Sequence, residues 1–207
     1  AVTVRPVQDD ASLEELVLAV SGASRLGVVP VVRPSGLREL IGLGLSWATG
    51  SADYLAFDAG ETLPTKKALG ALAPLLRNPR IAKAAVDSKA LHLALAPYDI
   101  RVGGLDFDAS LAGYVQNPGR RSYPLSDSVR ELLRESLHDG PLGSGPEDVA
   151  RHAGSTAEAL VRLAPLVLDR LASEGLADAY RDIELPLAPL LADMERVGVR
   201  GGADLLR

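Results

Sequence analysis

Few residues of this chain combine a reactive type with a spacing that chemistry could use. The chain has no cysteine and three scattered histidines, which excludes disulfides, thiolate zinc sites, cysteine nucleophiles and a histidine-built metal site. Asp106 and Asp108 alternate on a predicted strand and superficially resemble the paired carboxylates of an acid–base catalyst. Because Asp108 directly precedes a helix-like segment, we expect it to cap that helix instead.

Two other groups of residues could bind or catalyse. His152 is an isolated histidine with no carboxylate near it in sequence to orient it, so we interpret it as a surface or packing residue rather than a general base. Arg120 and Arg121, followed by Tyr123, form the best candidate for nucleic-acid contact, because arginine and an aromatic ring together can hold a strand. Two arginines in a loop are more often simply solvated.

Composition and charge limit the function classes. Of 207 residues, 47% are hydrophobic and 24% are charged, as in globular proteins, and the net charge is −5. An acidic total has the wrong sign for a free-standing nucleic-acid binder, and only residues 61–121 carry an excess of basic side chains. The sequence shows neither a membrane-spanning apolar stretch nor a signal peptide, so we expect a cytoplasmic protein without a membrane partner.

The elements that would position these residues alternate between strands and helices. Ser12, three residues before Glu15, predicts a capping-box start for a helix that ends at Gly22. The segment 49–51 is typical of a hairpin turn between two apolar runs, one of which carries Trp47 as a predicted core residue. Strands are predicted at 2–7, 26–32, 40–47, 53–57, 81–86 and 103–107, and helices at 64–77, 88–96 and 109–116.

The second half of the chain is predicted to be helical from Ser126 onward. The glycine-rich segment 140–146 interrupts it and is the best candidate for a flexible loop. Strands first, then a mixed part, then helices predict an α/β fold, with a mixed central sheet flanked by helices. Residues 201–207 break off within an element, so we expect the chain to be part of a longer protein.

The most specific string lies near the C-terminus. Residues 183–199 read IELPLAPLLADMERVGV, an amphipathic helix with a proline pair near its start and a glycine at its end. It resembles the junction at which the polymerase domain begins in bacterial DNA polymerase I of family A. Upstream, residues 40–57 and 98–117 are similar to strands and a βα unit of the 3′-to-5′ proofreading exonuclease domain that precedes this junction. The resemblance implies an RNase H-like, DnaQ-type fold.

Proofreading exonucleases of this class are two-metal hydrolases in which four acidic side chains hold two divalent cations through oxygen. In the family, the first two ligands form an Asp-x-Glu motif at the end of the first sheet strand, and these positions fall here on Val31 and Arg33. The acid of the second motif falls on Leu91. The tyrosine and the aspartate of the third motif fall on His152 and Thr156.

Aliphatic, hydroxyl and guanidinium groups do not hold Mg²⁺ as carboxylates do, and a cation at Arg33 would repel it. The resemblance therefore implies a vestigial exonuclease domain that has no catalytic residue, metal or cofactor and acts as a structural module of a replication and repair polymerase.

Two alternatives stay open. A rearranged set of acids, Asp87, Asp106 and Glu158, could support a weak metal-dependent 3′-to-5′ exonuclease. We nevertheless expect Asp87 to cap a helix and Glu158 to face solvent, because it lies two residues, about 200° of helical turn, past Thr156. The former groove could instead hold single-stranded DNA without cleaving it.

The domain boundary is expected near residue 180. Residues 1–180 would form the vestigial exonuclease-like domain, and residues 181–207 the truncated first helix of the polymerase domain. We expect the helix Glu184–Val197 to pack on the polymerase domain of the same chain, with DNA contacted through that polymerase. A monomer is the default expectation for such a domain.

Overall fold

Six strands form one mixed sheet at the centre of the computed structural model, which describes residues 2–33, 39–57, 63–137 and 145–198. The strand order is β1-β4-β3-β2-β5-β6, and β3 runs antiparallel to both of its neighbours, while the other pairs are parallel. The strands are β1 (Thr3–Pro6), β2 (Arg25–Val32), β3 (Leu40–Ala48), β4 (Ser51–Ala56), β5 (Ala82–Ala85) and β6 (Leu105–Asp108).

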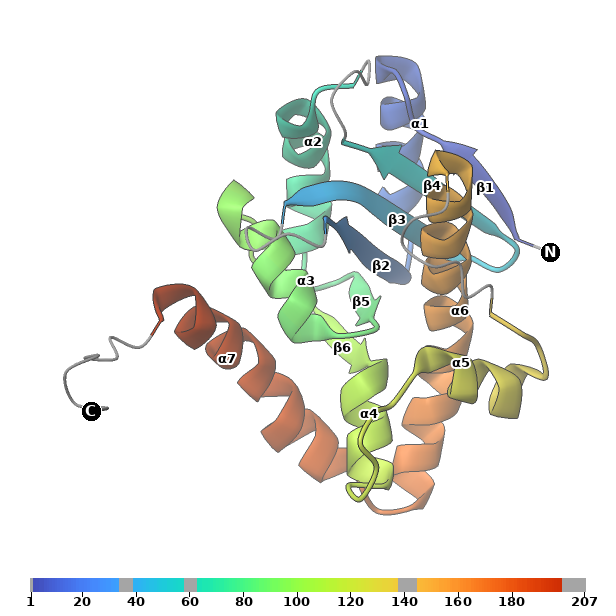
Figure 1. The fold of residues 1–207 in the computed structure, drawn as a ribbon, viewed down its shortest axis with the longest axis vertical. Coiled ribbons are helices and arrows are strands. Elements are labelled where there is room, and N and C mark those ends of the chain that lie inside the picture. The colour runs from blue at the N-terminus through green and yellow to red at the C-terminus, as the bar shows by residue number, and fades with distance from the viewer. Residues whose placement is uncertain (1, 34–38, 58–62, 138–144, 199–207) are drawn as a thin grey trace.

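Helices cover both faces of this sheet (Figure 1). They are α1 (Asp10–Ser21), α2 (Thr65–Arg77), α3 (Ser88–Leu95), α4 (Ala109–Gln116), α5 (Leu125–Ser128), α6 (Pro146–Ser173) and α7 (Leu185–Val197), with a 3₁₀ turn at Ala96–Tyr98 and π-helical turns at Val129–Leu133 and Ala179–Glu184. Among the described residues, no helix is both long and apolar enough to cross a membrane.

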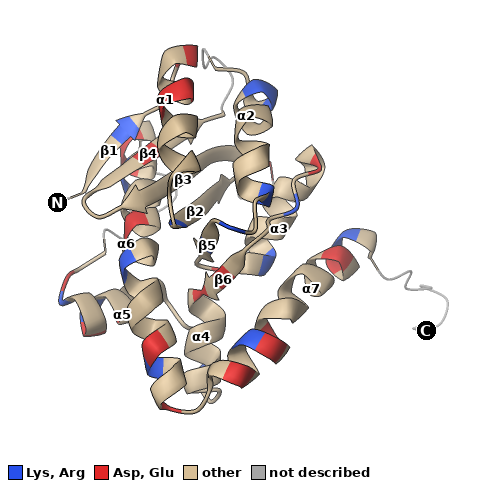
Figure 2. Ribbon diagram, turned by 180° about the vertical axis from the view of Figure 1, so that it is seen from behind, with Lys and Arg blue, Asp and Glu red and all other residues tan. Residues whose placement is uncertain are grey.

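Two apolar layers result. The largest buried cluster joins α1, α2 and α3 to one face of the sheet, and the view from behind shows α1 and α2 lying over it (Figure 2). The long helix α6 lies against the opposite face, where a second cluster joins it to α4 and β6. Glycines allow α6 to approach closely: a Cβ added at Gly27 of β2 would lie 2.1 Å from the carbonyl oxygen of Ala157. The sheet and α6 are therefore in backbone contact.

The predicted α/β architecture is confirmed, and most predicted elements appear within a few residues of their expected bounds. One helix start differs. The N-cap of α1 is Asp9, whose side chain accepts from the Ser12 N–H at 2.8 Å while the Ser12 side chain accepts from the Asp9 N–H. Ser12 is therefore the N3 residue of the capping box and not its N-cap. Glu15 instead pairs with Arg5 of β1. Most of the glycine-rich segment 140–146 lies outside the described residues.

The chain ends in an arm that leaves the body of the molecule. Helix α7 packs along α3, and its inward residues Leu185, Ala188 and Ala192 are buried. Lys89 of α3 pairs with Glu195 of α7 at 3.0 Å. Figure 1 shows α7 projecting from the foot of α4 toward the C-terminus.

A lysine side chain is fully buried in the core of this fold. Lys83 of β5 has no exposed surface, and its ammonium donates to the carbonyl oxygen of Asn78, the residue that ends α2. Burial lowers the pKa of Lys83 to about 8 from its ordinary 10.5. The folded state therefore releases this proton more readily than the unfolded chain does, and holding the charged form is unfavourable at neutral pH.

We expect Lys83→Met to raise the free energy of unfolding by about 2 kcal/mol at pH 7, because it removes a buried charge and keeps the apolar stem. The unfolded chain binds more protons between about pH 8 and 10.5, so the wild-type protein gains stability across that window and the advantage of the variant shrinks. Urea unfolding at pH 7 and at pH 10 measures both effects. Lys67→Met, at a half-exposed lysine paired with Asp10, is the control and should show neither.

Candidate functional site

The end of β2, where the resemblance places the first metal motif, is apolar in the structure. Val31, Tyr54 of β4 and Ala153 of α6 form one buried cluster, against which Val149 and Ala150 of α6 also pack. Tyr54 is 7% exposed, and a Cβ added at Gly42 would lie 2.0 Å from its hydroxyl oxygen, so the ring lies across Gly42. Gly42 is the register partner of Val31. An aromatic ring and aliphatic side chains thus fill the space beside Val31.

Arg33 lies just beyond β2 and is half exposed. Its Nε donates to Oε2 of Glu39 at 3.0 Å, and its backbone N–H donates to the Glu39 carbonyl oxygen at 2.8 Å. From the sequence, Arg33 was expected to be an unpaired cation, because Glu39, six residues later, was not considered as its partner. In the structure, this surface ion pair balances the guanidinium charge.

The second motif is divided between a helix cap and the core. Asp87 is the N-cap of α3 and accepts from the Ala90 N–H at 2.9 Å, which confirms the capping interpretation. Leu91 is fully buried in the cluster shared by α1, α2 and α3. Val31 belongs to a different cluster, on the α6 face. The structure therefore does not bring Leu91 and Val31 into one apolar cluster.

The third motif lies on α6. Thr156 is buried, and its Oγ1 has no hydrogen-bond partner among the described residues. His152 is half-buried near the start of the same helix. Neither residue offers a carboxylate.

The expectation that Glu158 faces solvent is wrong. Glu158 is 2% exposed; its Oε1 accepts from the Gly50 N–H at 3.0 Å, and its Oε2 lies 3.5 Å from Nη1 of Arg162. The hairpin turn between β3 and β4 folds over α6, so the carboxylate satisfies a backbone donor in that turn. This contact spans 108 positions and no local pattern predicts it.

The three acids of the alternative nuclease site are not gathered in one place. Asp87 caps α3, Asp106 pairs with Arg25, and Glu158 binds the β3–β4 turn. Within the part of the chain that the structure describes, no three His, Asp or Glu side chains lie close enough to hold a metal ion. Two-metal chemistry needs several oxygen ligands around shared cations, and the residues present do not fit that group.

In the loop that carries Arg120, Arg121 and Tyr123, Arg120 and Tyr123 have partners within the chain. Arg120 pairs with Asp127 at 2.5 Å, and the hydroxyl of Tyr123 donates to the carbonyl oxygen of Asn117 at 2.7 Å. The Tyr123 ring meets Tyr114 edge-on. Arg121 is exposed. The adjacent hollow also carries Glu131 and Glu174, so its charge is mixed and does not favour phosphate.

Sequence reasoning missed a buried polar junction where α3, α4 and the C-terminal arm meet. Oδ2 of Asp108 accepts from both the N–H and the hydroxyl of Ser88, and Oδ1 accepts from the Leu111 N–H at 2.9 Å. The expected cap on α4 is thus confirmed, with Ser88 as an additional partner. The hydroxyl of Tyr180 accepts from the Asp108 N–H at 2.7 Å. Burial raises the pKa of both Asp108 and Tyr180.

Comparison with known proteins gives the relationship. The family model of the ribonuclease H-like domain of DNA polymerase I matches residues 42–138. DNA polymerase I of Mycobacterium leprae is 32% identical over 197 residues, which cover 88% of this chain and 21% of that protein. This chain is similar to the ribonuclease H-like domain of DNA polymerase I. It spans about a fifth of the length of the curated DNA polymerase I relatives that it matches.

Solved structures agree with this relationship. A structure described as the POL domain of Pol1 from M. smegmatis, in complex with DNA primer-template and dNTP, has a TM-score of 0.76 at 26% identity, over 95% of this chain and 32% of that one. Brucella melitensis NrnC bound to pGG has a TM-score of 0.75 at 17% identity and is covered over 98% of both chains, a likeness of fold alone. The ribonuclease H-like fold implied by the sequence resemblance is confirmed.

Proposed function

We propose that this chain is a catalytically inactive exonuclease-like domain that serves as a structural module of a DNA polymerase I. The observation that carries the proposal is the chemistry at the four ligand positions: Val31, Arg33, Leu91 and Thr156 supply no carboxylate. The apolar cluster of Val31, Tyr54 and Ala153 supports it, because an aromatic ring occupies the space beside the first of these positions.

We expect the purified chain to release no nucleotides from 5′-labelled single-stranded DNA in either Mg²⁺ or Mn²⁺. The measurement compares product with and without EDTA, beside an active proofreading polymerase as a positive control. EDTA-sensitive cleavage would refute the proposal. If Asp87→Asn or Glu158→Gln then abolished that cleavage, the rearranged-ligand alternative would replace it.

Titration of labelled single strands at low salt addresses the DNA-holding alternative. The acidic net charge of −5 and the paired state of Arg120 predict a Kd no tighter than about 10⁻⁴ M. Tighter binding that Arg120→Ala and Arg121→Ala weaken would support that alternative.

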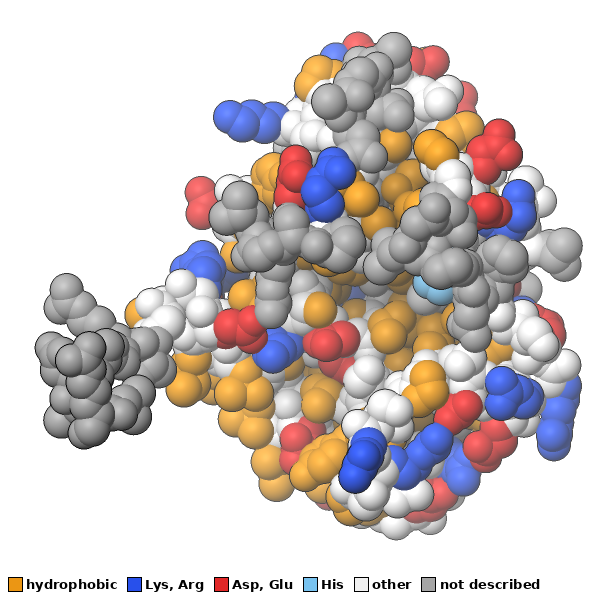
Figure 3. Space-filling view, in the orientation of Figure 1, with side chains coloured by type: hydrophobic (Ala, Val, Ile, Leu, Met, Phe, Trp, Pro, Cys, Tyr) orange, Lys and Arg blue, Asp and Glu red, His pale blue; other side chains and the backbone are white. Residues whose placement is uncertain are grey.

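We further propose that residues 1–180 form this module and that residues 181–207 open the polymerase domain. The support is the outer face of α7, where large apolar side chains stay exposed: Leu187, Leu190, Leu191, Met194 and Val197. Hydrophobic side chains gather along this arm in Figure 3. An apolar stripe of this extent marks an interaction surface, and the polymerase domain of the same chain is its proposed partner.

We expect Leu190→Glu combined with Met194→Glu, in the intact parent polymerase, to loosen the contact between module and polymerase domain. Limited proteolysis should then cut near residue 180 several-fold faster. Leu18→Glu, at an apolar side chain of α1 that is 76% exposed, is the matched control and should leave the rate unchanged. Equal rates for the two variants would contradict the proposed interface.

A further inference from the structure

A cavity of about 550 Å³ lies between α3, the segment 96–102 and α7. Its volume falls in the range of small-molecule sites. One wall carries Ile100, Val102 and Leu105, and the facing wall is formed by Leu185, Pro186 and Pro189 of α7. The cavity thus has two apolar walls.

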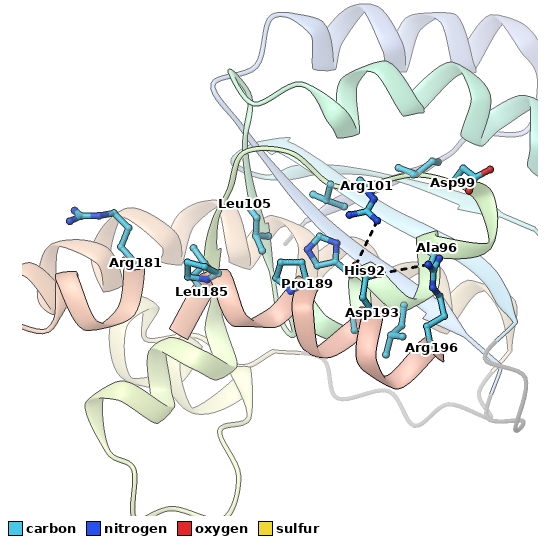
Figure 4. Close-up of a pocket in the computed structure, with 15 residues that line it drawn as sticks. His92, Ala96, Asp99, Arg101, Leu105, Arg181, Leu185, Pro189, Asp193 and Arg196 are labelled. Carbon is cyan, nitrogen blue, oxygen red and sulfur yellow. Dashed lines mark ion pairs between the residues drawn. The ribbon is translucent and has the colours of Figure 1, made fainter. Parts of the chain in front are cut away.

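The ends of the cavity differ in chemistry. Arg101 and Arg196 lie at one end with Asp193, whereas Leu105, Leu185 and Arg181 lie toward the other, with His92 and Pro189 between them (Figure 4). Arg181 already pairs with two carboxylates, those of Asp178 and Asp182. The Arg101 end can therefore take the anionic group of a ligand whose faces lie against the two apolar walls.

The charged end carries two arginines and two aspartates, Asp99 and Asp193. Nη2 of Arg101 lies 3.6 Å from Oδ2 of Asp193, and Nη2 of Arg196 lies 3.8 Å from Oδ1 of the same carboxylate. Both separations exceed hydrogen-bond length, and one carboxylate serves two guanidinium groups. Asp99 lies farther out, beyond Arg101 (Figure 4). Neither guanidinium group is within hydrogen-bond distance of Asp193, and the planar fork of arginine suits phosphate oxygens.

The middle of the cavity is polar without being charged. Burial is the largest influence on His92 and lowers its pKa, so the imidazole is neutral at neutral pH. Its Nε2 has no hydrogen-bond partner among the described residues. This part of the wall can accept a ring that carries its own hydrogen-bonding groups.

We propose that this cavity binds a small ligand with a flat heteroaromatic ring and one phosphate, of the nucleoside monophosphate class. The ring lies between the proline face of α7 and the aliphatic wall beside His92, and the phosphate reaches Arg101 and Arg196. Because these contacts join α7 to the 96–102 segment, the ligand also stabilises the docked position of α7.

Titration of this chain with 5′-AMP, followed by NMR at low salt and neutral pH, tests the proposal. Adenosine and inorganic phosphate, each carrying half of the recognised chemistry, should bind at least about tenfold more weakly. Arg101→Ala and Arg196→Ala should each weaken 5′-AMP binding at least about fivefold, and Asp193→Asn, which removes the competing carboxylate, should tighten it. Hydrogen exchange in α7 should slow when 5′-AMP is present.

The control is Arg130→Ala, because Arg130 is a largely exposed arginine that lies outside the cavity and pairs with Asp127. Arg101 is 82% exposed and Arg196 is 52% exposed, so their truncation should not unfold the chain, and thermal melting verifies this. Absence of saturable 5′-AMP binding, equal binding of adenosine, or binding that both arginine variants retain would overturn the proposal. No metal is added, so the result is independent of the nuclease assay.

Discussion

Gly27→Val should destabilise this protein by about 3 kcal/mol or more. A Cβ at residue 27 would lie 2.1 Å from the Ala157 carbonyl oxygen and 3.2 Å from Cγ2 of Val161, both on α6. The nearest atom belongs to the backbone of a 28-residue helix, so relief requires the helix to move off the sheet rather than a side chain to rotate. Urea unfolding followed by circular dichroism measures the loss.

Gly70→Ala provides the matched control. Gly70 lies within α2, and nothing lies within 4 Å of a Cβ added there. Alanine lowers the conformational freedom of the unfolded chain and favours helix, so this substitution should stabilise by about 0.5–1 kcal/mol. Opposite signs at the two glycines would establish close packing as the cause; a neutral Gly27→Val would contradict the backbone contact between α6 and β2.

Asp108→Ala should cost about 3 kcal/mol, because the Asp108 carboxylate accepts three hydrogen bonds within the fold. Its removal leaves the buried N–H of Ser88 and the N–H of Leu111 without their acceptor. Asp108→Asn should recover part of the loss. Its amide oxygen still accepts a hydrogen bond, and a neutral side chain avoids the cost of burying a charge, which is what raises the pKa of Asp108. Chemical unfolding of the three proteins at pH 7 gives the comparison.

Asp87→Ala measures the stability cost of losing an exposed helix cap, for comparison with the buried cap at Asp108. Asp87 caps α3 through the Ala90 N–H at 2.9 Å, but this hydrogen bond is exposed. Water can replace the lost acceptor there, so the expected cost is about 1 kcal/mol. A loss at Asp108 no greater than the loss at Asp87 would show that the buried junction adds nothing to an ordinary cap.

Local signals in the sequence predicted most of the elements. The apolar run 26–32 and the turn at Gly50, whose φ is +81°, gave strands β2 to β4. Caps at Asp87 and Asp108 were read correctly because capping acts over three residues. The cap of α1 was misassigned because Asp9 and Ser12 both carry suitable oxygens, and the sequence does not show which of them lies outside the helix.

Contacts between distant residues could not be predicted in this way. Strand β1 pairs with β4 across 48 positions, and the β4 side chain Tyr54 then covers Gly42. Glu158, Lys83 and Tyr180 owe their burial to such contacts. Each of these side chains hydrogen-bonds a backbone group that the fold would otherwise leave without a partner. Which backbone groups these are cannot be predicted from a single sequence.

For the candidate site, too, the sequence predicted local features but not contacts between distant residues. The residue types at Val31, Leu91 and Thr156 could be read by resemblance, but their surroundings could not. Only the fold shows that Leu91 belongs to the α1–α2 core, that Val31 belongs to a cluster with Tyr54, and that Glu39 accompanies Arg33.

The hydroxyl of Tyr180 accepts a hydrogen bond from the backbone N–H of Asp108 at the end of β6, and β6 is an edge strand of the sheet. A mechanical load on the C-terminal arm would therefore pass through this phenol into a strand with a single neighbour, β5. Such an edge can peel away one residue at a time while the antiparallel centre stays intact. When the arm is pulled, the contact between α7 and α3 is loaded first and the region around β6 next.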